Sequence, residues 1–134
     1  MGLQPVKIQT EDEIDIIDIT EEVEGAIPTD HTGVAVISAN HTTAAVIVNE
    51  AESRLTSDIA SMLKEVVEEG MYRHDEVDDN AAAHLRACLL SPSVVIPVAD
   101  GRLATGTWQS VMFVECDGPR SRTVTVVPLT STQS

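Results

Sequence analysis

Aromatic and basic side chains are the two classes that this sequence has least of. Its 134 residues include one Trp, one Tyr and one Phe, and Lys and Arg together number 8 against 22 Asp and Glu. Nucleic acids and anionic membrane surfaces are bound by basic patches, so the formal net charge of −14 argues against both as partners. The core has to be built from Val, Ile, Leu and Ala.

Cysteine is also scarce, and long apolar runs are missing. Cys88 and Cys116 form no C-x-x-C motif, and two thiols far apart in the sequence do not make a disulfide framework. No apolar stretch is long enough to cross a bilayer, and the first residues lack the basic and apolar regions of a signal peptide. We therefore expect a cytoplasmic protein with reduced thiols.

The acidic excess has two interpretations. In the first, a solvated acidic surface keeps the protein soluble. Acidity combined with a lack of lysine, here only Lys7 and Lys64, is also typical of proteins adapted to high salt, where screening removes the repulsion between like charges. We expect the second, halophilic adaptation.

The length fits one domain spanning the chain, with a polar tail at 130–134 that we expect to fray. An imperfectly alternating run at 13–19 predicts a strand with one wet face, and a short helix follows it to Gly25. Two runs rich in Val and Ile, at 33–40 and 43–49, predict two more strands.

Two longer helices are predicted in the middle of the chain. The first covers 54–69, and apolar residues at helical spacing mark its buried stripe. These are Leu55, Ile59, Met62, Leu63 and Val66. A polar loop at 71–78 leads to the second helix, which Asp78 or Asp79 caps and which runs to Leu90.

The C-terminal part reads as β-structure. Strands are predicted at 94–98, 108–116 and 121–129, and the last two form an antiparallel hairpin around the turn at 117–119. Strands and helices do not alternate as in a βαβ fold. The order therefore predicts an α+β domain with a mostly antiparallel sheet and two main helices.

Three of the four histidines lie in short polar clusters: His41, His74 and His84. Imidazole titrates between pH 5 and 8 and is a common metal ligand. His84 shares a predicted helix face with Cys88, and this face is apolar, so His84 points toward a packed region. It is either a core histidine bonded to a backbone carbonyl or, with His74 from the preceding loop, a metal ligand. Cys88 on that face is expected to be buried and inert.

Thr42 and Thr43 follow His41 at a predicted turn. Their hydroxyls and backbone N–H groups could hold a phosphate or carboxylate, or they could simply be solvated. Glu50 ends the strand before the first long helix, where a carboxylate serves either as a general base or as an acid at the helix N-terminus.

Gln109 and Glu115 share one face of the predicted strand 108–116 by period-two alternation. A partly buried Glu115 needs a partner, and Arg120 and Arg122 beyond the turn are the candidates. The group is either a structural ion pair or an anion clamp, because the guanidinium fork matches phosphate.

Seven short motifs occur in order along the chain. They are His41-Thr42-Thr43-Ala44, Asn49-Glu50, Tyr72-Arg73-His74, Asn80-Ala81-Ala82-Ala83-His84, Pro97-Val98-Ala99-Asp100-Gly101-Arg102-Leu103, Gly106-Thr107-Trp108-Gln109 and Glu115-Cys116-Asp117-Gly118-Pro119-Arg120. In these motifs the chain resembles the YjbQ-like family of small proteins, often described as secondary thiamine-phosphate synthases.

The resemblance implies a compact α+β domain of β-sandwich character, a homotrimer, and a divalent metal such as zinc in a histidine-lined pocket. Its metal ligands would be His41, His74 and His84. Glu50 and Glu115 would be catalytic, and the substrate would contact Asn80, Gln109 and Arg120, together with Thr42 and Thr43 at the turn. The label also implies an activity that joins a pyrimidine diphosphate to a thiazole phosphate.

Two hypotheses follow. The first is a metal-dependent enzyme acting on a small phosphorylated molecule, with a possible thiamine-phosphate synthase side activity. The second is a non-catalytic ligand-binding or structural trimer in which the histidines form a polar core.

Overall fold

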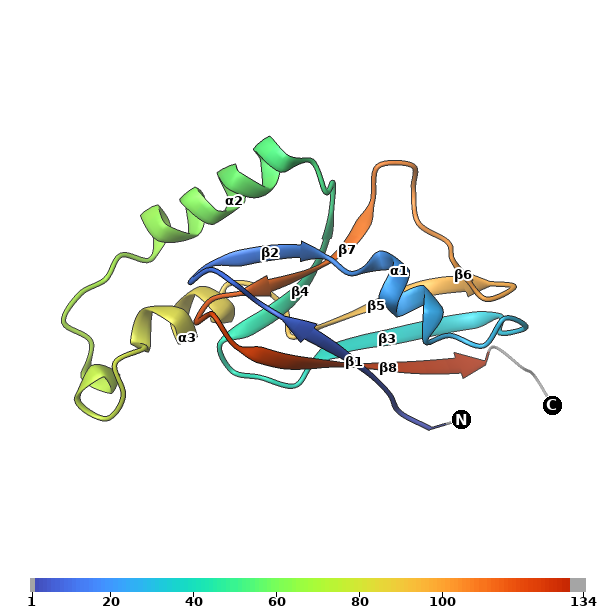
Figure 1. Cartoon of the computed structure of the whole chain (residues 1–134), viewed down its shortest axis with the longest axis horizontal. Coiled ribbons are helices and arrows are strands. Elements are labelled where there is room, and N and C mark those ends of the chain that lie inside the picture. Colours follow the sequence, from blue (N-terminus) through green and yellow to red (C-terminus); the bar gives the residue numbers. More distant parts are fainter. Residues whose placement is uncertain (1, 131–134) are drawn as a thin grey trace.

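Two antiparallel sheets and three α-helices make up the computed structural model, which describes residues 2–130 (Figure 1). The five-stranded sheet has the order β1-β8-β3-β5-β6, and the three-stranded sheet has the order β2-β7-β4. The elements in chain order are β1 (Gln4–Gln9), β2 (Asp15–Asp18), α1 (Thr20–Gly25), β3 (Gly33–Ala39), β4 (Ala44–Asn49), α2 (Ser53–Val66), the 3-10 helix η1 (Arg73–Glu76), α3 (Ala81–Cys88), β5 (Ser93–Ala99), β6 (Arg102–Leu103), β7 (Ser110–Glu115) and β8 (Ser121–Thr130). This confirms the expected α+β class with a mostly antiparallel sheet arrangement. Of the expected tail, only Thr130 lies within the described residues, where it ends β8.

The three-stranded sheet forms the middle layer of the molecule. On one side, Phe113 of β7 packs in a core cluster with residues of the five-stranded sheet such as Ile37. On the other side, Val114 packs with Leu63 of α2 and Ala83 of α3. Because β7 carries apolar side chains in both directions, both of its faces are covered, as the strands of a middle layer require.

The predicted hairpin of β7 and β8 is wrong. β7 pairs with β2 and β4, whereas β8 pairs with β1 and β3 in the other sheet. The turn at 117–119 therefore carries the chain from one layer to the next. The physical reason lies in the run 111–114, which is apolar at every position and fits a strand buried on both faces better than a hairpin arm with one wet face.

The crossing at 117–119 lies next to another of the chain's crossings between the sheets, at residues 40–43 between β3 and β4. The two crossings meet, because the backbone N–H of Cys116 donates to the carbonyl of Thr43 over 3.0 Å. Most of the site residues predicted from the sequence lie at or beside these crossings.

Helix α2 covers the middle layer less closely than the sequence predicts. It ends at Val66 and not at 69, and Leu63 is its one buried residue. Met62 and Val66 are 48% and 62% exposed, so their predicted burial is wrong. The helix begins at a cap formed by Glu52, whose carboxylate accepts from the backbone N–H groups of residues 54 and 55.

Helix α3 also differs from its prediction. Its buried face is made of small residues, including Ala83 and Ala87, which pack against Ala45 of β4. Alanines let the helix axis approach the sheet, and this turns Leu85 and Cys88 outward, where both are exposed. The helix ends at Cys88, short of the expected Leu90, and the loop before it contains η1.

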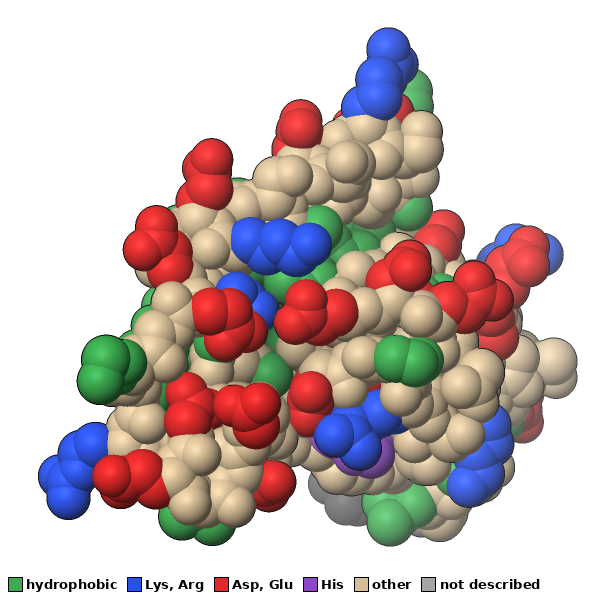
Figure 2. All heavy atoms as spheres, turned by 60° about the vertical axis from the view of Figure 1, so that its left-hand side comes forward, with side chains coloured by type: hydrophobic (Ala, Val, Ile, Leu, Met, Phe, Trp, Pro, Cys, Tyr) green, Lys and Arg blue, Asp and Glu red, His purple; other side chains and the backbone are tan. Residues whose placement is uncertain are grey.

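Acidic side chains outnumber basic ones on the surface. Figure 2 shows Asp and Glu spread over the displayed face, with few Lys and Arg between them. Four ion pairs to Lys or Arg occur among residues 2–130, so most of the 22 acids have no basic partner there. None of the helices in this part of the chain combines the length and apolar character that crossing a membrane demands.

Candidate functional site

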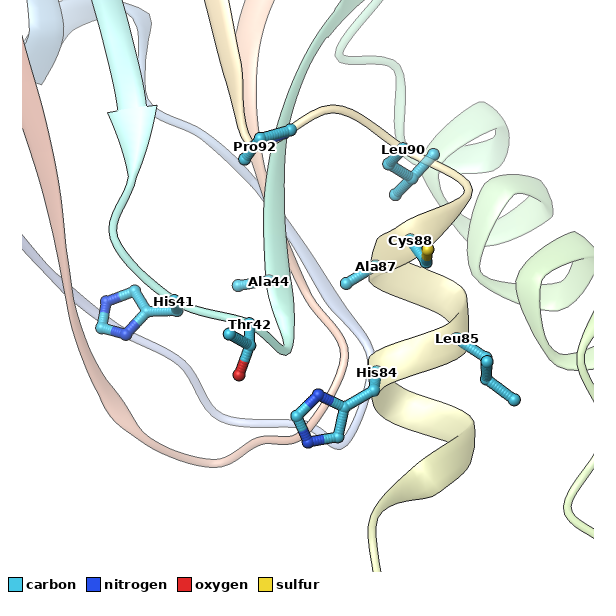
Figure 3. Close-up of a pocket in the computed structure, with 9 residues that line it drawn as sticks. All are labelled: His41, Thr42, Ala44, His84, Leu85, Ala87, Cys88, Leu90 and Pro92. Atoms are coloured by element: carbon cyan, nitrogen blue, oxygen red, sulfur yellow. The ribbon is translucent and has the colours of Figure 1, made fainter. Parts of the chain in front are cut away.

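A surface pocket of about 470 Å³ lies between the crossing at 40–43 and helix α3 (Figure 3). We call it the site pocket. Its lining consists of His41, Thr42, Ala44, His84, Leu85, Ala87, Cys88, Leu90 and Pro92. Two of the three predicted metal ligands and one of the two predicted turn hydroxyls therefore border one hollow.

His41 is tied to strand β8. The backbone N–H of Thr123 donates to its Nε2 over 3.0 Å, and in Figure 3 the ring is directed away from His84. Burial, and then the positive charge of Arg122, lower the pKa of His41 below its ordinary value. His41 is therefore neutral near pH 7, and it anchors the crossing loop on the five-stranded sheet.

His84 and His74 contact each other. Their ring centroids are 4.7 Å apart and the rings meet edge to face, with an angle of 78° between their planes. His84 is half-buried and its ring extends toward the side of the pocket where Thr42 lies (Figure 3). His74 comes from the exposed helix η1.

The three predicted ligands do not converge on one point. His84 contacts His74, and it shares the site pocket with His41. Within residues 2–130 of a single chain, no group of three or more His, Cys, Asp or Glu side chains is placed to hold a metal ion. The sequence alone could not foresee the bond of His41 to β8, because the hairpin prediction had placed that strand elsewhere.

Glu115 forms a buried ion pair with Arg122. Glu115 is fully buried; its Oε1 accepts from Arg122 Nε over 2.7 Å and from Thr10 Oγ1 over 2.9 Å. Its Oε2 accepts from Arg122 Nη2 and from the backbone N–H of Asp117. Burial alone would raise the pKa of Glu115, but these hydrogen bonds outweigh it and hold the pKa below its usual value.

The same Arg122 also fixes the crossing loop, because its Nη2 donates to Thr43 Oγ1 over 2.8 Å. Thr43 is buried by this contact, whereas Thr42 is exposed at the pocket. Of the two candidate partners of Glu115, Arg122 forms the ion pair and Arg120 does not. With all its oxygens engaged, Glu115 has the contacts of a structural ion pair that joins the two sheets.

Arg120 binds Asp117, a residue that was not among the predicted site residues. Arg120 Nη2 lies 2.9 Å from Asp117 Oδ2, and its Nε donates to the Asp117 carbonyl over 2.8 Å. Asn80, which precedes α3, donates to the same Oδ2 over 3.1 Å, and its own buried Oδ1 has no partner among the described residues. Asn80, which links this group to α3, lies about one helical turn before His84. The place of Asp117 in the Glu115-Cys116-Asp117 motif was the sequence signal that could have pointed to it.

Gln109 and Glu50 lie outside the lining of the site pocket. Gln109 precedes β7 in an exposed loop, where its Oε1 accepts from the backbone N–H of Gly106 over 2.8 Å. The strand begins at Ser110, so the predicted shared face with Glu115 does not extend to Gln109. Glu50 is half-buried between β4 and α2, and the helix-capping acid is Glu52.

The two cysteines differ sharply. Cys116 is buried in the core, and burial raises the pKa of its thiol to about 11. Cys88 is exposed and lines the site pocket beside His84. The predicted burial of Cys88 is wrong because alanines, and not the longer side chains of α3, face the sheet.

Known proteins are similar to this chain in sequence and in fold over nearly its full length. A family model described as UPF0047 protein YjbQ-like matches residues 4–131. A UPF0047 protein of Archaeoglobus fulgidus is 45% identical over 91% of this chain and 97% of its own length, and the UPF0047 protein YugU of Bacillus subtilis is 37% identical over 90% and 94%. The crystal structure of a hypothetical protein from Aeropyrum pernix K1 superposes with a TM-score of 0.93 at 42% identity, covering 98% of this chain and all of that one. A structure of a YjbQ/UPF0047 family protein from Clostridium acetobutylicum has a TM-score of 0.85 at 37% identity, covering 93% and 98%.

Proposed function

The chain belongs to the YjbQ-like UPF0047 family, and on that basis we propose that it is a metal-dependent enzyme acting on a small phosphorylated molecule at the site pocket. The observation that carries the proposal is that His84 borders the same pocket as His41 and Thr42 while contacting His74. A divalent ion such as zinc held there would neutralise phosphate charge or activate a water molecule.

The groups around the pocket suit a phosphorylated ligand. Thr42 offers an exposed hydroxyl at the pocket. Arg120 lies outside the pocket lining; it is half-exposed, and the guanidinium N–H groups that Asp117 leaves free are available to an anion. The Nε2 of His41 is engaged with Thr123, so His41 would offer a metal ion its Nδ1.

The reaction class is part of the same proposal. In the thiamine-phosphate synthase activity that the family resemblance implies, a pyrimidine diphosphate is joined to a thiazole phosphate and the diphosphate leaves. A metal ion would stabilise the charge of that leaving group. Glu50, outside the pocket lining but half-buried, is less fully engaged than Glu115 and is the better of the two proposed bases.

A homotrimer is the proposed assembly. Large apolar side chains remain exposed on α2, on β5 and on the loop that precedes β7: Met62, Val66, Val95 and Trp108. Exposed apolar side chains mark interaction sites where they gather into one patch, and these four are the proposed subunit contacts. Light scattering coupled to gel filtration should give three times the chain mass of 14.4 kDa, and a monomer mass would contradict the assembly.

The alternative function is a non-catalytic, ligand-binding or structural trimer with a polar histidine core. The bond between His41 and Thr123 favours it, because that histidine is already engaged in holding the fold.

Metal analysis of tag-free protein separates the two functions. The enzyme proposal predicts bound zinc, a lower melting temperature after EDTA, and binding of thiamine phosphate by calorimetry. His84→Ala should lose the ligand and keep the assembly, whereas Lys64→Ala, on the exposed side of α2, should bind as the wild type does. Absence of metal with an unchanged melting temperature in EDTA would refute the metal dependence. Loss of the assembly in His84→Ala would favour the structural role.

A further inference from the structure

We propose that residues 104–109 of a second copy of this chain, which we call the Trp108 loop, complete the site pocket in a head-to-tail contact. The inference deepens the proposed function and rests on it, because it names the surface that a partner subunit adds to that site. Contacts in which two different patches meet close into rings. The inference therefore also gives the proposed homotrimer a geometry.

The predicted site residues lie in two groups at opposite ends of the paired strands β4 and β7. At one end, Ala44 of β4 lines the site pocket. At the other end Asn49 pairs with Ser110, and the residues next to these two are Glu50 and Gln109. Five strand steps separate the two ends, a distance of about 17 Å. One chain therefore does not bring Gln109 to a ligand in its own pocket, whereas a second copy can.

The Trp108 loop is an exposed projection that is fixed before any contact forms. In Figure 1 it rises between β6 and β7, on the side of the molecule away from α3. Trp108 is 73% exposed. The Oε1 of Gln109 accepts from the backbone N–H of Gly106 over 2.8 Å, which closes the loop on itself. An aromatic side chain on a preformed loop loses little freedom when it docks, and Trp is a typical anchor of interfaces.

Charge limits where two copies of this chain can meet. With a net charge of −14 on each copy, repulsion is smallest where the touching surfaces carry no acid. The stretch 103–114, which includes the Trp108 loop, contains no Asp, Glu, Lys or Arg. The lining of the site pocket contains none either. Interface cores are depleted in charged residues and enriched in Trp, so these two uncharged surfaces suit each other.

The site pocket has room for an indole beside a ligand. In Figure 3, His84 and Thr42 lie toward one end of the pocket, and Leu90 and Pro92 lie toward the other. A volume of about 470 Å³ is within the range of pockets that hold drug-sized molecules. The partner's indole would fill the apolar end and leave the polar end to the phosphorylated molecule. The amide side chain that follows in the loop then comes within reach of that molecule.

Trp108 is the only tryptophan of the chain, so its fluorescence reports on the contact directly. In the assembled wild type the emission should be blue-shifted and protected from acrylamide quenching, and dilution should remove both properties together with the trimer mass. Trp108→Ala should raise the dissociation constant of the assembly by more than about tenfold, the effect of an interface hot spot. Leu3→Ala is the matched control, because it removes another apolar side chain that is 68% exposed, and it should leave the assembly unchanged.

Disulfide cross-linking tests the other side of the contact. Thr107→Cys places a thiol in the Trp108 loop, and the exposed Cys88 lines the site pocket. Oxidation with copper phenanthroline should join the copies through these two thiols and give linked chains on a non-reducing gel. The double variant Thr107→Cys/Cys88→Ser should give none. Ser57→Cys, at an exposed position of α2, is the matched control and should not link to Cys88.

The outcomes separate this contact from the proposed function. A trimer in which Trp108 stays open to acrylamide, or in which Thr107→Cys does not link to Cys88, would overturn the inference and leave the proposed homotrimer and its ligand standing. A monomer mass would overturn the inference together with the assembly. Protected Trp108 and a specific cross-link, without binding of metal or thiamine phosphate, would sustain the contact and refute the proposed enzyme alone.

Discussion

Arg122→Met should be among the most damaging single substitutions in this chain. It removes the two guanidinium contacts to the fully buried Glu115 and the contact to Thr43. Removing one partner of a buried pair typically costs about 3–5 kcal/mol. Domains of ordinary stability unfold with about 5–15 kcal/mol, so the loss is a large fraction of the total.

The free energy of unfolding lost in Arg122→Met should become smaller as the pH falls. In the wild type the pKa of Glu115 is lowered, so the stability from its ionised form is present above the ordinary value of 4.5 and is lost as the pH falls through the lowered pKa. Without Arg122, burial dominates and raises the pKa of Glu115. The variant then gains relative stability as Glu115 becomes protonated, and the gap to the wild type narrows on acidification.

Urea unfolding followed by circular dichroism at neutral and acidic pH measures both effects. Arg120→Met is the matched control, since its pair with Asp117 is half-exposed and exposed pairs contribute about 0–1 kcal/mol. The double variant Glu115→Gln/Arg122→Met should lose less than Arg122→Met alone, because no buried charge is left unpaired. A loss in Arg122→Met as small as that of the control, or one that does not shrink on acidification, would refute the reasoning.

Two further predictions concern His41 and salt. Because the pKa of His41 is lowered on folding, the wild type should lose stability as the pH falls below the ordinary value of 6.5, and His41→Asn should remove this part of the pH dependence in urea titrations; an identical pH profile in the variant would contradict it. The melting temperature should rise with KCl concentration, because screening relieves repulsion in a chain of net charge −14, and a flat or falling trend would argue against halophilic adaptation.

The sequence predicted the class of the fold better than its strand pairing. Alternation and helical spacing located most elements, although β1 was missed. Pairing of β7 with β8 was wrong because a short turn suggests a hairpin, whereas the run 111–114 had the apolar character of a strand buried on both faces. The residue pattern thus held a signal that the turn obscured.

In the candidate site, too, some contacts could be predicted from the residue pattern and others could not. Strand parity could not have separated Arg122 from Arg120, since both have the parity of the buried Val124 and Val126; the two differ because β8 begins at Ser121 and leaves Arg120 in the turn. The contact of His74 with His84 could not be predicted, because it depends on the path of the loop containing η1. Exposure of Cys88 depends on how closely the alanine face of α3 approaches β4, which helical spacing alone does not determine.

The position of β8 bears on how the molecule forms. β8 is the last strand of the described residues, yet it lies inside the larger sheet, between β1 and β3. During synthesis, β1 has no partner in the larger sheet until β8 leaves the ribosome, more than a hundred residues later. Pairings between such distant segments slow folding and leave strand edges open to wrong partners. Assembly of this sheet should therefore be a late step, and truncations that enter β8 should yield chains that aggregate.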